Sequence, residues 1–122
     1  MTAIISLTDK VERIVAKRVI DTLLTAGYSV ALINEDTPVT DRYLLQPTKD
    51  RAAIDENLMS MGHEYWAAVD ADGKEHGWVF FSFFGGNGEA CIANWSLPPV
   101  LDAFMDGVIV WCGEADFEQL AA

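Results

Sequence analysis

The sequence has few cysteines and no long apolar run. Its two cysteines, Cys91 and Cys112, do not form a short-spacing motif. A chain of 122 residues buries roughly two-thirds of its unfolded surface and can support a core without disulfides. We therefore expect one domain over residues 1–122 with reduced, packed thiols in a cytoplasmic setting. No stretch of about 18 uncharged apolar residues occurs, and the N-terminus lacks a signal-peptide pattern, so neither a membrane span nor secretion is expected.

Basic residues are scarce, above all in the second half of the chain. Nineteen acidic residues face eight basic ones, for a net charge of −11. After Arg51 the only Lys or Arg is Lys74, against twelve carboxylates. Such a charge repels nucleic acid and anionic membranes and attracts a basic partner. The alternative is that the acidic surface serves solubility alone.

Motifs that would identify an enzyme or a metal centre are missing. The four possible zinc ligands, His63, His76, Cys91 and Cys112, are not arranged in the close pairs of structural zinc sites. A nucleophilic pair such as Cys91 with His76 stays open, because partners need not be adjacent in sequence. A small packed cysteine in mid-strand is the simpler interpretation. We therefore assign no catalytic or metal-binding residue and no cofactor, and expect a non-enzymatic protein.

Two turns are rich in glycine. The turn at residues 70–73, DADG, resembles half of a calcium loop, but its glycine comes fourth rather than sixth. The turn at 85–88, GGNG, could present backbone N–H groups to an anion, but no Lys, Arg or helix start is near it. Both are interpreted as connections between strands.

Hydrophobic periodicity predicts an α+β fold with helices packed on a mostly antiparallel sheet. The predicted elements are a helix over 8–26 capped by Thr8 or Asp9 and ended by Gly27, a strand over 28–34, a helix over 48–61 capped by Thr48 and ended by Gly62, strands over 63–70, 77–84 and 89–96, and a C-terminal helix from about Pro98. Residues 39–46 could add a short strand that Pro47 ends, 109–112 could be helix or strand, and 116–120 could form a last helical turn.

The last three strands form an antiparallel meander that contains eight of the thirteen aromatic residues. Its middle strand is apolar on both sides, so we expect something to cover each face. The aromatic content exceeds what one small core needs, which also leaves open a dimer or partner surface.

Several segments resemble small uncharacterised acidic proteins of proteobacterial phages and mobile elements. The matching segments are residues 23–28, 50–54, 72–73, 77–79, the glycine turn and 92–96. These are turn and core positions, and no catalytic residue follows from them. The resemblance implies an accessory protein, a class that includes inhibitors of host defence, some of which imitate the charge of nucleic acid.

The expected function is therefore that of an acidic interaction protein that binds a basic partner, with inhibition of a host defence complex (anti-CRISPR or anti-restriction) as one form. The candidate partner-binding residues are Asp70, Asp72, Glu75, Glu89, Asp102, Asp106, Glu114, Asp116 and Glu118. One alternative is a small enzyme or ligand-binding domain with a pocket near His63, His76 and Cys91. The other is a structural homodimer.

Overall fold

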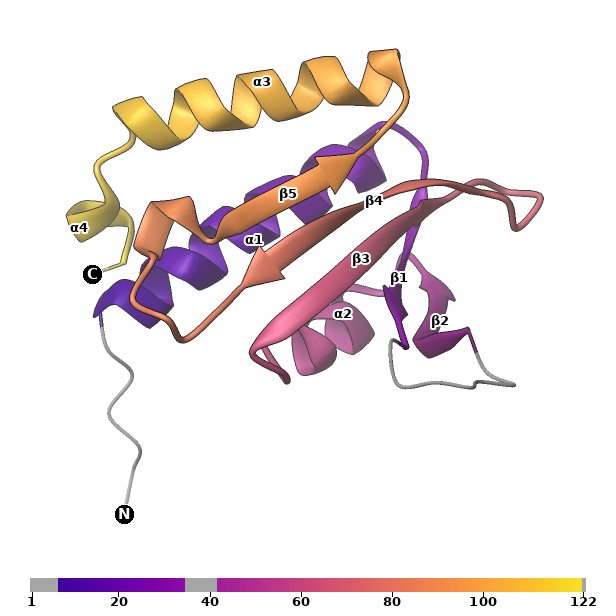
Figure 1. The fold of residues 1–122 in the computed structure, drawn as a ribbon, viewed down its shortest axis with the longest axis horizontal. Coiled ribbons are helices and arrows are strands. Elements are labelled where there is room, and N and C mark those ends of the chain that lie inside the picture. The colour runs from indigo at the N-terminus through magenta and orange to yellow at the C-terminus, as the bar shows by residue number, and fades with distance from the viewer. Residues whose placement is uncertain (1–6, 35–41, 122) are drawn as a thin grey trace.

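A computed structural model describes residues 7–34 and 42–121, and this part of the chain is an α+β domain, as predicted (Figure 1). The helices are α1 (Leu7–Thr25), α2 (Arg51–Asn57), α3 (Pro99–Glu114) and α4 (Phe117–Leu120), with a 3₁₀ turn η1 (Gly88–Ala90). The strands are β1 (Ser29–Ile33), β2 (Tyr43–Thr48), β3 (His63–Val69), β4 (Glu75–Ser82) and β5 (Ile92–Ser96).

The strands form one antiparallel sheet in the order β2-β1-β3-β4-β5. The meander β3-β4-β5 is confirmed, and β1 is an interior strand, as its two apolar faces predict. Pro47 does not end the strand predicted over 39–46 but lies inside β2. A proline is tolerated there because β2 is an edge strand, where an N–H can be spared. Residues 39–41 of that prediction lie outside the described residues.

The main core lies between the helices and one face of the sheet. Val15, Ala16 and Val19 of α1 are fully buried there, against strand residues such as Trp66 and Phe81. All the helical residues of the core belong to this one cluster. In Figure 1, α1 runs behind β4 and β5, and α3 lies above the edge strand β5. The helices therefore form one layer and the sheet the other.

The opposite face of the sheet has only a thin core of four small or branched strand residues, namely Ala31, Ile33, Ala67 and Val69. The prediction that something covers both faces of the middle strand is therefore wrong for the described residues. Trp78 and Tyr65 lie on this face and pack edge to face, with ring centroids 5.1 Å apart. The aromatic rings cover the small residues themselves, which is why this face holds together without a helix.

Helix boundaries differ from the prediction where polar side chains intervene. α1 begins at Leu7, before both predicted caps, and its last residue is Thr25. Gly27 follows in the predicted left-handed conformation, with φ of +99°. α2 is shorter than the predicted 48–61 helix. Its N-cap is Asp50, which accepts a bond from the Ala52 N–H at 3.1 Å, while Thr48 belongs to β2. The start of α2 is thus set by a local polar bond rather than by the apolar stripe.

The glycine turns are hairpin connections, as predicted, but the strands beside them are displaced. β4 covers 75–82 instead of 77–84, and residues 89 and 90 of the predicted 89–96 strand belong to η1, before β5 begins. Residues 109–112 are helical within α3, and α4 confirms the last helical turn. Within the described ranges, no helix is long and apolar enough to cross a membrane.

Candidate partner-binding surface

Among the large apolar residues of the described chain, the two most exposed lie on α3. Val100 is 74% exposed and Val110 59%, and Phe104 and Ile109 are also exposed. The buried stripe of α3 is Leu101, Met105, Val108 and Cys112. The spacing of Val100, Leu101, Phe104, Val108 and Trp111 predicts one apolar face for this helix, but Val100 and Phe104 are exposed. The reason is that α3 is apolar on nearly all sides, so sequence alone does not fix which side faces the core.

Carboxylates accompany these apolar residues. Asp106 and Glu114 on α3 and Glu118 on α4 are exposed, and no hydrogen bond or ion pair holds their side chains within the described residues. The sequence has no Lys or Arg after Lys74. We call Val100, Phe104, Asp106, Val110, Glu114 and Glu118 the α3–α4 surface.

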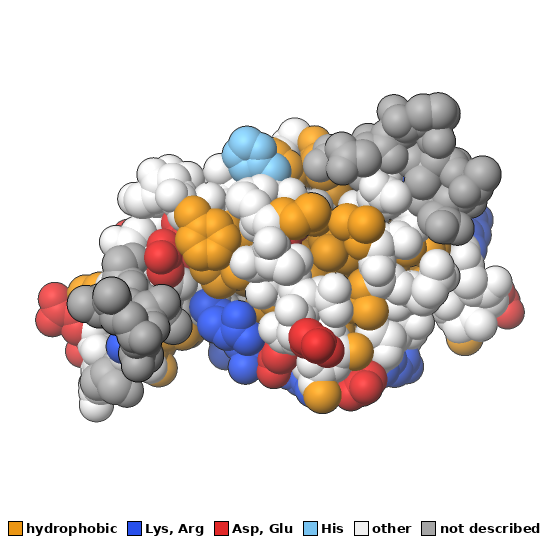
Figure 2. Space-filling model, turned by 90° about the horizontal axis from the view of Figure 1, so that it is seen from below, with side chains coloured by type: hydrophobic (Ala, Val, Ile, Leu, Met, Phe, Trp, Pro, Cys, Tyr) orange, Lys and Arg blue, Asp and Glu red, His pale blue; other side chains and the backbone are white. Residues whose placement is uncertain are grey.

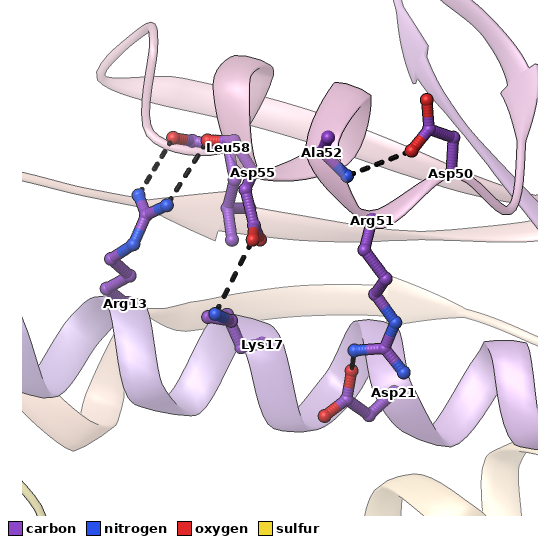
Figure 3. Close-up of polar contacts among 8 residues, drawn as sticks. All are labelled: Arg13, Lys17, Asp21, Asp50, Arg51, Ala52, Asp55 and Leu58. Carbon is purple, nitrogen blue, oxygen red and sulfur yellow. Dashed lines mark hydrogen bonds and ion pairs between the residues drawn. The ribbon is translucent and has the colours of Figure 1, made fainter.

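The basic residues are mostly used elsewhere, between α1 and α2. Figure 3 shows Arg13 donating to the carbonyl oxygens of Asp55 and Leu58, at 3.2 and 3.5 Å. Lys17 pairs with Asp55 at 3.6 Å, and Arg51 pairs with Asp21. The space-filling view from below Figure 1 shows acidic and basic side chains interspersed, with hydrophobic ones among them (Figure 2). α3 and α4 contribute carboxylates and no basic side chain, and the cations beside them come from α1: Arg18 lies over the Trp111 ring, 4.8 Å from its centroid, and Lys10, Arg13 and Lys17 line a shallow pocket with Leu120.

Three of the predicted partner-binding residues lie at the β3–β4 hairpin, away from α3 and α4 (Figure 1). Asp70 accepts bonds from the N–H groups of Asp72 and Lys74 and contacts His76 Nε2 at 2.6 Å. The His76 bond and the backbone bonds lower the pKa of Asp70. Asp70 therefore organises the turn, and Asp72 is exposed beside it.

Glu75 likewise bonds to other side chains of the protein. Its carboxylate accepts two bonds from Arg42, at 2.9 and 3.0 Å, and one from the Tyr43 hydroxyl at 2.6 Å. The Arg42 bond lowers the pKa of Glu75. Burial, with the bond to Glu75, raises the pKa of Tyr43 to about 12. This cluster ties the edge strand β2 to the start of β4.

Two further predicted residues also have structural roles. Asp102 accepts a bond from the Trp95 indole N–H at 2.6 Å, and Asp116 caps α4 through the Gln119 N–H. Glu89 and Glu118 are brought together on the wall of an open pocket of about 330 Å³ beneath η1 and α4. The structure thus places Glu89 and Glu118 on one pocket wall and Asp106 and Glu114 on α3, and separates the three hairpin residues from them.

The residues of the alternative enzymatic site are not brought together. His63 and His76 lie at opposite ends of the β3–β4 pairing. Cys91 is fully buried under α1, and burial raises its thiol pKa to about 12, which disfavours the thiolate that nucleophilic chemistry needs. Both cysteines are free and buried. In the described part of the chain, no three His, Cys, Asp or Glu side chains are placed to hold a metal ion.

The glycine turn does present N–H groups to an anion, and the anion belongs to the protein. The Glu12 carboxylate, buried on α1, accepts bonds from the N–H groups of Phe84 and Gly88 at 2.8 and 3.1 Å. A second buried carboxylate, Glu64, accepts bonds from the Met59 and Met61 N–H groups and the Trp66 indole. Burial raises the pKa of Glu64.

Sequence reasoning missed both buried glutamates. A signal for Glu12 exists: it lies three and seven residues before Val15 and Val19, on the apolar face of α1. Both carboxylates hold loops that contain a non-glycine residue with positive φ, Met59 at +64° and Phe84 at +62°. The bonds to the carboxylates thus offset local backbone strain.

No protein-family model, curated protein or solved structure matches this chain. A functional assignment therefore rests on the chemistry of the surface and not on homology.

Proposed function

We propose that this protein is a non-enzymatic interaction protein whose α3–α4 surface binds a partner with a basic surface. The observation that carries the proposal is that α3 and α4 combine exposed apolar side chains, led by Val100 and Val110, with exposed carboxylates and contribute no Lys or Arg of their own. Apolar residues at the centre of an interface supply burial, and surrounding charges steer the encounter and select the partner. Two free, buried thiols fit a reducing compartment such as the cytoplasm.

A nucleic-acid-binding complex of host defence is the partner class that we propose, because its basic channel complements this surface. The resemblance to phage and mobile-element proteins supports the same class by association. Inhibition would follow from occupying the channel. The proposal does not require the carboxylates to reproduce the spacing of phosphates in nucleic acid.

The spacing of charges favours docking over such imitation. Asp102 and Glu114, with Asp106 between them, are twelve helical steps apart on α3, which is about 18 Å at the rise of an α-helix. One DNA strand carries about five phosphates over that length. Asp102 is also held by Trp95, which reduces the free charge further. α3 is therefore better described as an apolar surface with a few carboxylates than as a regular row of negative charges.

Capture from a host lysate, at low and at several-fold higher salt, tests the proposal. The bait variants are Val110→Lys, on the α3–α4 surface, and Leu44→Lys, on the opposite edge strand, where Leu44 is 50% exposed. We expect the native chain and Leu44→Lys to retain a basic protein at low salt, and Val110→Lys to lose it. Recovery of no basic protein at either salt, or equal recovery with all three baits, contradicts the proposal.

The captured partner then allows a direct test of the channel. Fluorescence anisotropy of a labelled nucleic acid bound to the purified partner should fall when the native chain is added, and should not change with Val110→Lys. If the chain binds without displacing nucleic acid, the defence-channel part of the proposal is wrong, although the basic partner stands.

A further inference from the structure

The strand side chains on the uncovered face of the sheet carry almost no net charge. The side chains that β1, β3, β4 and β5 direct to this face include a single carboxylate, Glu75. Arg42 pairs with that carboxylate at 2.9 Å, so the formal charge of the pair is zero. The whole chain carries −11. The acidic charge is therefore carried by other parts of the molecule.

Aromatic side chains dominate the centre of this face. Tyr65 stacks on Phe80 with ring centroids 4.4 Å apart, meets Trp78 edge to face, and His63 meets Phe80 at 5.6 Å. Tyr65, Trp78 and Phe80 are all half-buried. Uncharged polar residues surround them, namely Ser82, Asn94 and Ser96. An aromatic centre with a polar rim is the composition of a protein–protein interface.

The charge distribution selects a second copy of this chain as the occupant. Two molecules of charge −11 repel each other, and the repulsion is smallest where neither contributes net charge to the contact. The α3–α4 surface would bring carboxylates against carboxylates in a symmetric pair. A basic partner, in turn, gains nothing from the neutral face. The same face on both copies can be self-complementary about a two-fold axis.

We infer that two copies of this protein associate through the uncovered sheet face, sheet on sheet, at high concentration. The resulting order of layers is helix, sheet, sheet, helix. The two sheets pack face to face, as the sheets of a β-sandwich do. Both α3–α4 surfaces then point outward and stay free. The inference thus goes beyond the proposed function and does not depend on it.

Analytical ultracentrifugation of the full chain, up to about 1 mM protein, measures the association. The test variant is Asn94→Asp with Ser96→Asp, which adds carboxylates to the exposed polar rim; the change at position 94 keeps a side-chain oxygen to accept the Trp95 N–H bond. The matched control is Ala103→Asp with Gly113→Asp, which adds the same charge to exposed positions of α3. We expect the rim variant to raise the dimer dissociation constant at least about tenfold at low salt, and added salt to reverse part of this change.

The rim variant should fold normally, and circular dichroism checks this. Native chain that stays monomeric over the whole concentration range overturns the inference. So does a dimer that the α3 control weakens as much as the rim variant does. Because salt should weaken binding to a basic partner but preserve or strengthen this dimer, failure of one is distinguishable from failure of the other.

Chemical trapping locates the contact independently. Both native cysteines are buried, so an introduced Ser96→Cys or Val110→Cys provides the accessible thiol for a short bismaleimide. We expect covalent dimers from Ser96→Cys and few from Val110→Cys. The opposite result would place the contact on α3 and contradict the inference.

Discussion

Replacing Glu12 by alanine should loosen the loop between β4 and β5. In the native protein the Glu12 carboxylate is fully buried and accepts the N–H bonds of Phe84 and Gly88. Alanine removes both acceptors and leaves two backbone N–H groups without a partner at the edge of the core. It also removes the contact that holds Phe84 at a positive φ of +62°.

The expected loss of stability is large for a single substitution. A hydrogen bond to a charged group contributes about 1.5–3 kcal/mol, so the two bonds together contribute about 3–6 kcal/mol. For a 122-residue chain the entropy of unfolding is about 0.26 kcal/mol/K near the midpoint. The melting temperature should therefore fall by about 12–23 °C.

Thermal unfolding followed by circular dichroism measures this loss, with Glu56→Ala as the matched control. Glu56 is an exposed glutamate on α2, and its replacement should cost less than about 0.5 kcal/mol. Glu12→Gln should lie between the two, because it keeps one acceptor. Formate, which can occupy the vacated site, should restore part of the stability of Glu12→Ala and none of Glu56→Ala.

A local readout separates loss of the loop contact from general destabilisation. Amide hydrogen exchange of Phe84 and Gly88 should accelerate more in Glu12→Ala than exchange in the interior strand β1. Equal melting temperatures for Glu12→Ala and Glu56→Ala would refute the assigned role of the buried carboxylate.

Three further results are expected. Gly77→Ala should lower the free energy of unfolding in urea by more than about 3 kcal/mol, because the alanine Cβ would lie 2.0 Å from the Ser96 carbonyl oxygen. Near-native stability of this variant would contradict the close contact between Gly77 and Ser96. The bond from Arg42 lowers the pKa of Glu75, so the stability that the Glu75 carboxylate contributes is present above the ordinary carboxyl pKa and is lost as pH falls through the folded pKa. Native protein should therefore lose more stability than Glu75→Gln between about pH 5 and 3. Parallel plots of unfolding free energy against pH for the two proteins would contradict this. Burial raises the pKa of Cys91 to about 12, so a thiol reagent should label it at mild alkaline pH only after unfolding, and rapid labelling of folded protein would exclude the buried placement.

Much of the fold follows from local patterns. The spacing of Val11, Val15 and Val19 predicts α1, and the glycine turns predict the meander, because both signals involve neighbours in sequence. The coverage of the sheet could not be predicted in the same way. Whether a helix lies over Trp78 depends on long-range packing, and Tyr65 and Phe80 supply a cover that periodicity does not distinguish from a buried face.

The candidate site was predictable in composition but not in geometry. The excess of carboxylates is visible in sequence, yet four of the nine predicted residues, Asp70, Glu75, Asp102 and Asp116, bond to groups within the protein. Their partners are set by turn conformation and by pairing across strands. The apolar component of the α3–α4 surface was missed because an evenly apolar helix does not reveal its outer side.

The salt dependence of binding to the captured partner tests the central claim most directly. Isothermal titration calorimetry at about 50 and 500 mM salt compares the native chain with the double variant Asp106→Asn, Glu114→Gln. It separates the contribution of the carboxylates to binding from that of the apolar side chains. We expect native affinity to fall at least about tenfold with salt, and the variant to bind more weakly at low salt and to respond less to it. Equal affinity of both proteins at both salt concentrations would contradict an acidic α3–α4 surface as the binding site.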